Sequence, residues 1–218
     1  MHPAQSVGWD LPKWNFIDKP MGEYAVISKL IEILISLVIL VPIFWTLNLV
    51  RFRNAAETIR YFIFAVYLSA VYLFVGMPTL QFMRFELSLT LMPFLPMMAD
   101  IKNTILNVFL FVPLGLLLPL LWKKYQSYKN TIVLGFVLSL SIELLQILTY
   151  RATDINDIIA NTIGAALGYC VFYIASCFVP SAMRFAKEKT EMPVIILSVV
   201  ITMFFVQPYL ATLYYTII

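Results

Sequence analysis

Long runs of apolar residues dominate the chain, and short polar stretches separate them. Six runs approach the length of about 20 residues that an α-helix needs to cross a bilayer core. They cover residues 26–50, 61–78, 104–122, 131–149, 158–180 and 194–218. Each is predicted to be helical, because lipid offers no hydrogen-bond partner to an open backbone. The pattern therefore predicts an all-α, polytopic membrane protein with about six transmembrane helices.

The composition supports this prediction. Of the 218 residues, 61% are hydrophobic and 12% are charged, and the mean hydropathy is +0.88. A soluble domain is nearer half apolar and a quarter charged, so soluble enzymes and nucleic-acid-binding modules are disfavoured. Cys170 and Cys177 are seven residues apart on one predicted helix, roughly 10 Å along its axis, which is too far for a disulfide. His2 is the single histidine, so a histidine zinc site and a Ser-His-Asp triad are poor candidates.

The distribution of lysine and arginine predicts the orientation of the helices. Residues 51–60, 123–130 and 181–193 together hold nine basic residues in 31 positions, whereas the alternate polar stretches hold five in 58. The more basic set is therefore assigned to the cytoplasm and both termini to the outside. In this scheme residues 1–25 form an extracytoplasmic segment without the apolar core of a cleavable signal peptide, and residues 26–218 form the helical membrane domain.

Local features modify the spans. Pro113, Gly115 and Pro119 interrupt the third span, where we expect a kink or a short unwound turn. Pro208 predicts a kink or break in the last span. Residues 85–98 are too apolar for an ordinary loop and too short to cross the membrane. A re-entrant or interfacial segment before the third span and a loop packed over the helix ends are the two alternatives.

Two glycines in the fifth span form a GxxxG pattern, Gly164 to Gly168. Small residues at this spacing let helix backbones approach closely. We expect the pattern to pack against the third or fourth span of the same chain rather than to form a dimer.

Polar side chains inside the predicted spans gather in the outer half of the membrane. Ionisable groups at this depth are costly and usually face a bundle interior or a watery cavity. Together with the adjoining loop they form a candidate ligand-binding site: Asn107, Glu143, Gln146, Arg151, Asp154, Asp157 and Asn161. The coincidence of these residues from three spans predicts one shared pocket that opens outward.

Structural alternatives exist for several of these residues. Asp154 could be a helix N-cap, with Asp157 as an acid in the first turn. Asn161 could simply join two helices by a hydrogen bond. Arg151 could lie at the membrane interface or pair with Glu143 or Asp154. Glu143 is the one acid in its span, which favours a functional role, with a structural ion pair as the alternative.

The same residues resemble a known family. The run from Asn107 to Gly115, NVFLFVPLG, resembles the third-span signature of VanZ-like membrane proteins. The second half of the site is similar to that family's signature E-L-x-Q … R-x-x-D-x-x-D-x-x-x-N-T-x-G-A, with Glu143 at its start and Ala165 at its end. The resemblance covers roughly residues 90–170, and residues 1–80 and 181–218 carry no comparable pattern.

Two positions depart from the family pattern. Met92-Pro93-Phe94 is similar to a preceding N-L-x-P-F element, but Thr90 stands where that element has Asn. Asn156 stands where many relatives have an acid next to the position of Asp157. A metal or proton that needs this extra carboxylate would be bound more weakly here.

The resemblance implies a bacterial cell-envelope protein that alters susceptibility to the lipoglycopeptide teicoplanin. In this hypothesis the outward-facing site binds a membrane lipid, a lipid-linked wall precursor or the drug, and Arg151 holds an anionic group. The composition predicts no nucleic-acid partner, and we expect no cofactor other than a possible divalent cation. The sequence does not determine the oligomeric state.

Two other functions compete with binding. One is an intramembrane enzyme acting on a lipid-linked substrate, with Glu143 as general base and Asp154 and Asp157 holding a divalent cation. No histidine cluster or nucleophile motif accompanies the acids, so binding is preferred. The other is a transporter, which ranks lower because the intramembrane polar groups stop in the outer half.

Overall fold

A computed structural model of the chain describes residues 21–81, 83, 89–90, 100–149, 153–179, 186–188 and 191–217. Six helical segments among these residues are long and apolar enough to cross a membrane. They are α1 (Met21–Leu47), α2 (Ala55–Phe74), α4 (Ile101–Leu121), α5 (Tyr128–Gln146), α6 (Ile155–Phe178) and the rod formed by α7 (Met192–Ile201) and α8 (Gln207–Ile217). The predicted all-α polytopic fold is confirmed.

Short elements join or interrupt these helices. A π-helical turn, η1 (Asn48–Phe52), extends α1, and a 3-10 turn, η2 (Lys123–Gln126), leads from α4 into α5. The strands β1 (Leu89–Thr90) and β2 (Thr153–Asp154) pair in parallel, with Leu89 opposite Thr153. This pairing ties the segment before α4 to the start of α6.

The start of α2 differs from its predicted position at residue 61. Asn54 caps the helix, because its side chain accepts a hydrogen bond from the backbone N–H of Glu57 at 3.1 Å. The charged residues Glu57 and Arg60 interrupt the apolar run but not the helix. Helix formation depends on capping and backbone hydrogen bonds, so hydropathy alone places this boundary too late.

Prolines act differently in the two spans that contain the predicted breaks. Helix α4 continues through Pro113 and Pro119, so the unwound turn, one of the two alternatives expected there, does not occur. A proline removes one backbone donor, and α4 tolerates this loss without leaving the helical conformation. In the last span, the π-helical turn η4 (Thr202–Val206) directly precedes Gln207 and Pro208. The helix therefore widens just before the position of the predicted kink or break, and α8 continues through Pro208.

Helices α4 and α6 pack with their backbones in contact. A Cβ atom placed on Gly164 would lie 2.2 Å from the carbonyl oxygen of Val108, and one on Gly168 would lie 2.0 Å from that of Val112. A Cβ on Gly115 of α4 would likewise lie 2.0 Å from the Ala165 oxygen. The GxxxG pattern therefore packs against the third span of the same chain, as predicted.

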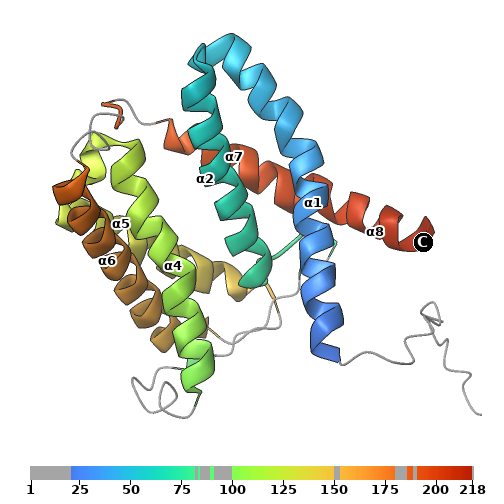
Figure 1. The fold of residues 1–218 in the computed structure, drawn as a ribbon. Coiled ribbons are helices and arrows are strands. Elements are labelled where there is room, and N and C mark those ends of the chain that lie inside the picture. Colours follow the sequence, from blue (N-terminus) through green and yellow to red (C-terminus); the bar gives the residue numbers. More distant parts are fainter. Residues whose placement is uncertain are drawn as a thin grey trace, which may run out of the picture.

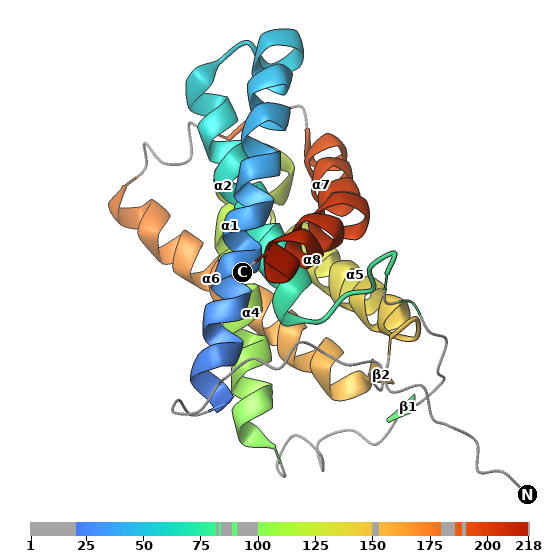
Figure 2. The same cartoon turned by 90° about the vertical axis from the view of Figure 1, so that its right-hand side faces the viewer.

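Helix α2 packs against α1, α4 and α7, and helix α8 contacts α1. Helices α1 and α2 form an antiparallel pair, and the α7–α8 rod crosses them obliquely (Figures 1 and 2). Phe44, Phe64 and Trp122 are among the largest buried side chains at the centre. Many apolar side chains point outward instead, including Val38, Trp45 and Phe178. Exposed apolar residues of this number suit contact with lipid rather than water.

Three basic connections lie at one end of the bundle, which we call the basic end. They are the turn between α1 and α2, the turn between α4 and α5, and the segment that leads into α7 (Figure 1). The backbones of Lys123 and Lys187 bond to one another, with Lys123 N–H donating to the Lys187 oxygen at 3.0 Å. The structure thus places at a common end the described parts of the three stretches that the sequence assigns to the cytoplasm.

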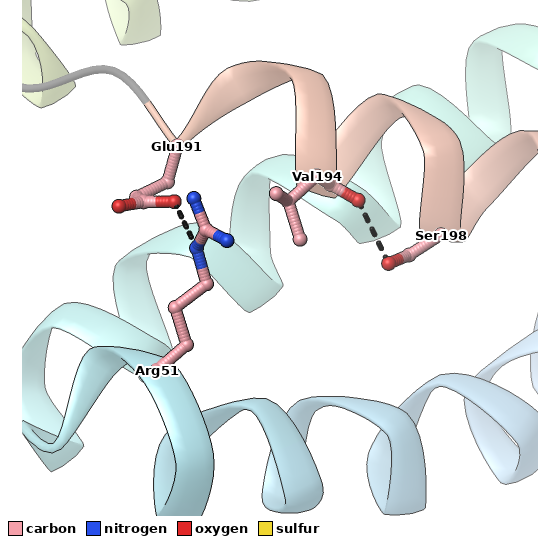
Figure 3. A network of polar contacts seen from close by, with 4 residues as sticks. All are labelled: Arg51, Glu191, Val194 and Ser198. Carbon is pink, nitrogen blue, oxygen red and sulfur yellow. Dashed lines mark hydrogen bonds and ion pairs between the residues drawn. The ribbon is translucent and has the colours of Figure 1, made fainter.

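Ion pairs partly neutralise this end. Lys123 pairs with Glu188 at 2.7 Å, and Lys187 pairs with Glu57. Arg51 Nε donates to Glu191 Oε2 at 2.5 Å, which joins the end of the α1 rod to the start of α7 (Figure 3). One turn further along α7, the Ser198 hydroxyl donates to the Val194 oxygen at 2.8 Å.

Breaking the Arg51–Glu191 pair is expected to lower the free energy of unfolding only slightly. Both side chains are partly exposed, and exposed ion pairs typically contribute about 0.2–1 kcal/mol. A double-mutant cycle with Arg51→Ala and Glu191→Ala, measured by denaturant unfolding in detergent, should give a coupling energy in this range that falls as salt rises. A salt-independent coupling of several kcal/mol would contradict this expectation.

Candidate functional site

A cavity of about 420 Å³ lies between the ends of four helices that point away from the basic end. It is lined by the last residues of α2, the first turns of α4 and α6, and the last turns of α5. We call it the polar pocket because six polar side chains line it: Asn103, Asn107, Glu143, Gln146, Asp157 and Asn161. Apolar residues, among them Phe74 and Leu110, supply the rest of the wall.

Glu143 connects α5 to the start of α6. Its side chain is buried, with only 1% of the residue exposed, and Oε2 accepts the backbone N–H of Asp154 at 2.9 Å. The Thr153 hydroxyl donates to the Glu143 backbone oxygen at 3.0 Å. A carboxylate held by a backbone N–H makes a strong, charge-assisted bond. The connection between α5 and α6 therefore fixes the position of Glu143 at the pocket wall.

Two amide side chains join helices around the pocket. Gln146 Nε2 donates to the Val75 oxygen at 2.8 Å, which links α5 to the residue after α2. Asn161 Nδ2 donates to the Ser139 hydroxyl oxygen at 2.9 Å, which links α6 to α5. These bonds hold three of the four helices that form the pocket at defined positions.

Two amide atoms at the pocket have no hydrogen-bond partner among the described residues. They are Asn107 Nδ2 and Asn161 Oδ1, and Asn161 is only 2% exposed. Exchanging the oxygen and nitrogen of Asn161 would move the unpaired atom to Nδ2 and leave the count unchanged. A buried polar atom without a partner is costly. Both atoms therefore retain unused hydrogen-bonding capacity at residues that line the pocket.

The structure places five of the seven predicted site residues around the polar pocket: Asn107, Glu143, Gln146, Asp157 and Asn161. Asp154 does not line it. Its carboxylate caps α6, accepting from the Asn156 backbone N–H at 2.9 Å and from Asn156 Nδ2 at 2.7 Å. The capping alternative thus describes Asp154, because its side chain turns back to the first turn of its own helix. Arg151 lies outside the described residues.

Two other predictions concern the segment before α4 and a metal site. Of the segment 85–98, only Leu89–Thr90 is described, as strand β1. No group of three or more histidine, cysteine, aspartate or glutamate side chains that could hold a metal occurs in the described part of the chain. The carboxylates that line the polar pocket are Glu143 and Asp157. A cation held by Asp154 and Asp157 stays a prediction.

Sequence reasoning missed the contribution of α2 and of Asn103. Asn103 precedes Asn107 by four residues and so lies on the same face of α4, a signal that could have been found. Val75 contributes a carbonyl oxygen to Gln146, and no side-chain pattern indicates such a role.

Comparison with known proteins assigns the family. The model of the VanZ/LLP1 family matches residues 26–176. This chain belongs to the VanZ/LLP1 family. Protein VanZ of Enterococcus faecium is 37% identical to it over 90 residues, which are 41% of this chain and 55% of that protein. The chain therefore spans about half the length of this relative. No solved structure matches significantly.

The family match is longer than the motifs indicate. It begins at residue 26 and so includes α1 and α2, whereas the resemblance begins near residue 90. The match therefore extends the family resemblance, which the motifs place at roughly residues 90–170, to residues that carry no comparable motif. Residues 26–80 contribute apolar helices that lack the polar motifs on which the resemblance depends. Helices α7 and α8 lie beyond the match.

Proposed function

We propose that this chain is a bacterial cell-envelope protein that alters susceptibility to lipoglycopeptides such as teicoplanin by binding an outer-leaflet molecule in the polar pocket. Membership of the VanZ/LLP1 family supports the assignment to this class of membrane protein. The observation that carries the binding role is the pair of unpartnered amide atoms at a pocket between transmembrane helices. Such atoms gain hydrogen bonds when a ligand enters.

The position of the pocket supports an outward-facing site. It lies at the ends of the helices opposite the basic end. Basic connections favour the cytoplasm, so the polar pocket would open towards the outer leaflet. Lipid-linked wall precursors and lipoglycopeptides meet at this surface.

The chemistry of the pocket favours a ligand rich in hydrogen-bond donors. Glu143 and Asp157 supply carboxylates, and Asn103, Asn107 and Asn161 supply amides. Ammonium, amide and sugar hydroxyl groups complement this set. The volume of about 420 Å³ suits a lipid headgroup, a precursor fragment or one substituent of a larger antibiotic. We include Arg151 as the residue that would hold a phosphate or carboxylate of the same ligand.

Catalysis by Glu143 as a general base is the second candidate. Glu143 lines the pocket, but its Oε2 already accepts the Asp154 N–H and the residue is 1% exposed. A group anchored in this way favours binding over proton abstraction. Modified lipid after incubation of the purified protein with envelope extract would favour the enzyme; unchanged lipid would favour binding.

Replacing Asn107 by leucine tests the binding role. The amide nitrogen of Asn107 has no partner among the described residues, so the substitution breaks no hydrogen bond of that nitrogen within the described chain and fills part of the pocket. In a strain whose teicoplanin susceptibility changes on deletion of this protein, we expect Asn107→Leu to abolish most of the change. The readout is the minimum inhibitory concentration at equal protein abundance.

The matched control is Asn130→Leu. Asn130 Nδ2 donates to the Lys124 oxygen at 2.7 Å near the basic end, so this variant loses a bond far from the pocket. It should keep the full susceptibility change. Full activity of a normally abundant Asn107→Leu variant would contradict the proposed pocket.

A further inference from the structure

A second cavity, of about 460 Å³, lies between the first turns of the membrane-spanning part of α1, the end of α2 and helix α8. We call it the α1–α8 cavity. Helix α8 passes close to α1 in this region (Figures 1 and 2). Thr149, which follows α5, also lines it, so the cavity lies at the same end of the bundle as the polar pocket. The turn after α2, at Gly76, lies at its wall, whereas Phe74 and Val75 line the polar pocket.

Two opposite charges line the α1–α8 cavity. Lys29 and Glu32 stand close to the start of the span Ile27–Phe52, three residues apart on one helix. Their Nζ and Oε2 atoms are 3.5 Å apart, longer than the 2.7–2.9 Å of a good charge-assisted bond. The pairs Arg51–Glu191 and Lys123–Glu188 at the basic end are closer, at 2.5 and 2.7 Å. An ammonium has three donors and a carboxylate several acceptor sites, so both groups retain capacity for a ligand.

Unsatisfied hydroxyls accompany the charges. Thr79 Oγ1 and the Tyr215 hydroxyl line the same cavity, are buried, and have no hydrogen-bond partner among the described residues. The wall that carries them is itself held in place. Leu80 N–H donates to the Phe204 oxygen at 3.1 Å, and the Thr212 hydroxyl donates to Gln81 Oε1 at 3.1 Å. The unpaired hydroxyls therefore belong to an ordered site.

We infer that the α1–α8 cavity binds a zwitterionic group that carries a phosphate and a primary ammonium. Lys29 and the hydroxyls of Thr79 and Tyr215 would bind the phosphate oxygens, and Glu32 would accept the ammonium N–H groups. Leu73 and Met77 line the cavity beside them and suit the carbon chain of the ligand. The charges lie near the start of a span, where phospholipid headgroups lie, so the zwitterionic headgroup of phosphatidylethanolamine fits in chemistry and depth.

This site is independent of the proposed function. Its wall includes α8, which lies beyond the residues that match the family model. It shares no lining residue with the polar pocket. An assay of headgroup binding tests the α1–α8 cavity and an assay of teicoplanin susceptibility tests the polar pocket. Either proposal can therefore be contradicted while the other stands.

Native mass spectrometry of the full-length protein in detergent tests the inference. The protein is mixed with equal amounts of phosphatidylethanolamine and phosphatidylglycerol that carry the same acyl chains. Phosphatidylglycerol offers the phosphate without the ammonium. We expect phosphatidylethanolamine to be retained about tenfold more, the scale of one charge-assisted hydrogen bond. Glu32→Gln should abolish this preference, whereas Glu188→Gln at the basic end should preserve it.

Two further variants keep the test valid if Glu32→Gln does not fold. Thr79→Val and Tyr215→Phe remove hydroxyls that bond to nothing within the described chain, so both should retain less phosphatidylethanolamine at an unchanged unfolding temperature. Soluble phosphoethanolamine is added as a competitor. If it displaces the lipid fully, the natural ligand of the cavity is a soluble molecule of the same chemistry. If it displaces none, the natural ligand is the lipid. Equal retention of the two lipids by the unaltered protein, or unchanged retention by both hydroxyl variants, would overturn the inference.

Discussion

Gly168→Val is expected to destabilise this protein by about 3 kcal/mol or more, the upper part of the range for overpacked cores. A Cβ at residue 168 would lie 2.0 Å from the Val112 oxygen and 2.9 Å from the Val112 carbonyl carbon, both of which are backbone atoms. A flexible side chain could move aside, but the backbone of α4 cannot without separating the two helices. Because α4 and α6 also form two walls of the polar pocket, the variant should lose function as well.

Thermal and denaturant unfolding in detergent measure the effect. The matched control is Leu167→Ala, one residue away; Leu167 is 48% exposed, so this variant should change stability little. Gly168→Ala should fall between the control and the valine variant. A Gly168→Val protein as stable as the control would show that α4 and α6 do not approach as closely as the structure indicates.

Substitutions of Glu143 are expected to have the second largest effect on stability and function. Two of them separate the structural role of this residue from its functional role. Glu143→Leu removes the acceptor of the partly buried Asp154 N–H, and the loss of an acceptor costs up to about 1–3 kcal/mol for a fully buried donor. Glu143→Gln keeps a carbonyl oxygen that can accept the same N–H but removes the charge. We therefore expect the leucine variant to be less stable and less abundant, and the glutamine variant to be close to normal in both.

Susceptibility to teicoplanin then reports the role of the charge. If the carboxylate binds the ligand, Glu143→Gln loses most of the susceptibility change despite normal abundance in the membrane. Immunoblotting of membrane fractions and minimum inhibitory concentrations provide the two readouts. Full activity of an abundant Glu143→Gln protein would remove the charge of Glu143 from the proposed mechanism.

The predictions from sequence failed where a local physical effect outweighs hydropathy. The start of α2 was placed too late because Asn54 caps a helix whose first turns contain charged residues. Of the kink or short unwound turn expected near Pro113, the unwound turn is absent, because the helix tolerates the loss of one backbone bond. For Asp154 the sequence left a pocket role and a capping role open, and the structure shows the capping role, because the carboxylate bonds to Asn156.

Several features were readable from the residues alone. The six apolar runs, the shared end of the basic connections and the close packing of Gly164 and Gly168 follow from hydropathy, charge and residue size. Each of these features follows from the hydropathy, charge or volume of single side chains, and these properties can be read from the sequence without a fold. The polar side chains of α4, α5 and α6 were also correctly expected to lie near one another, because helix periodicity and span direction place them at one level.

Tertiary structure alone decided which polar atoms remain unpaired and which helices complete each cavity. The contact between Gln146 and the Val75 oxygen depends on how α2 lies against α5, and nothing in either segment encodes that distance. Lys29 and Tyr215 come from opposite ends of the chain, yet both line the α1–α8 cavity. Hydrogen bonds require a fit of a few tenths of an ångström, and such distances between segments are set only when all six spans have packed.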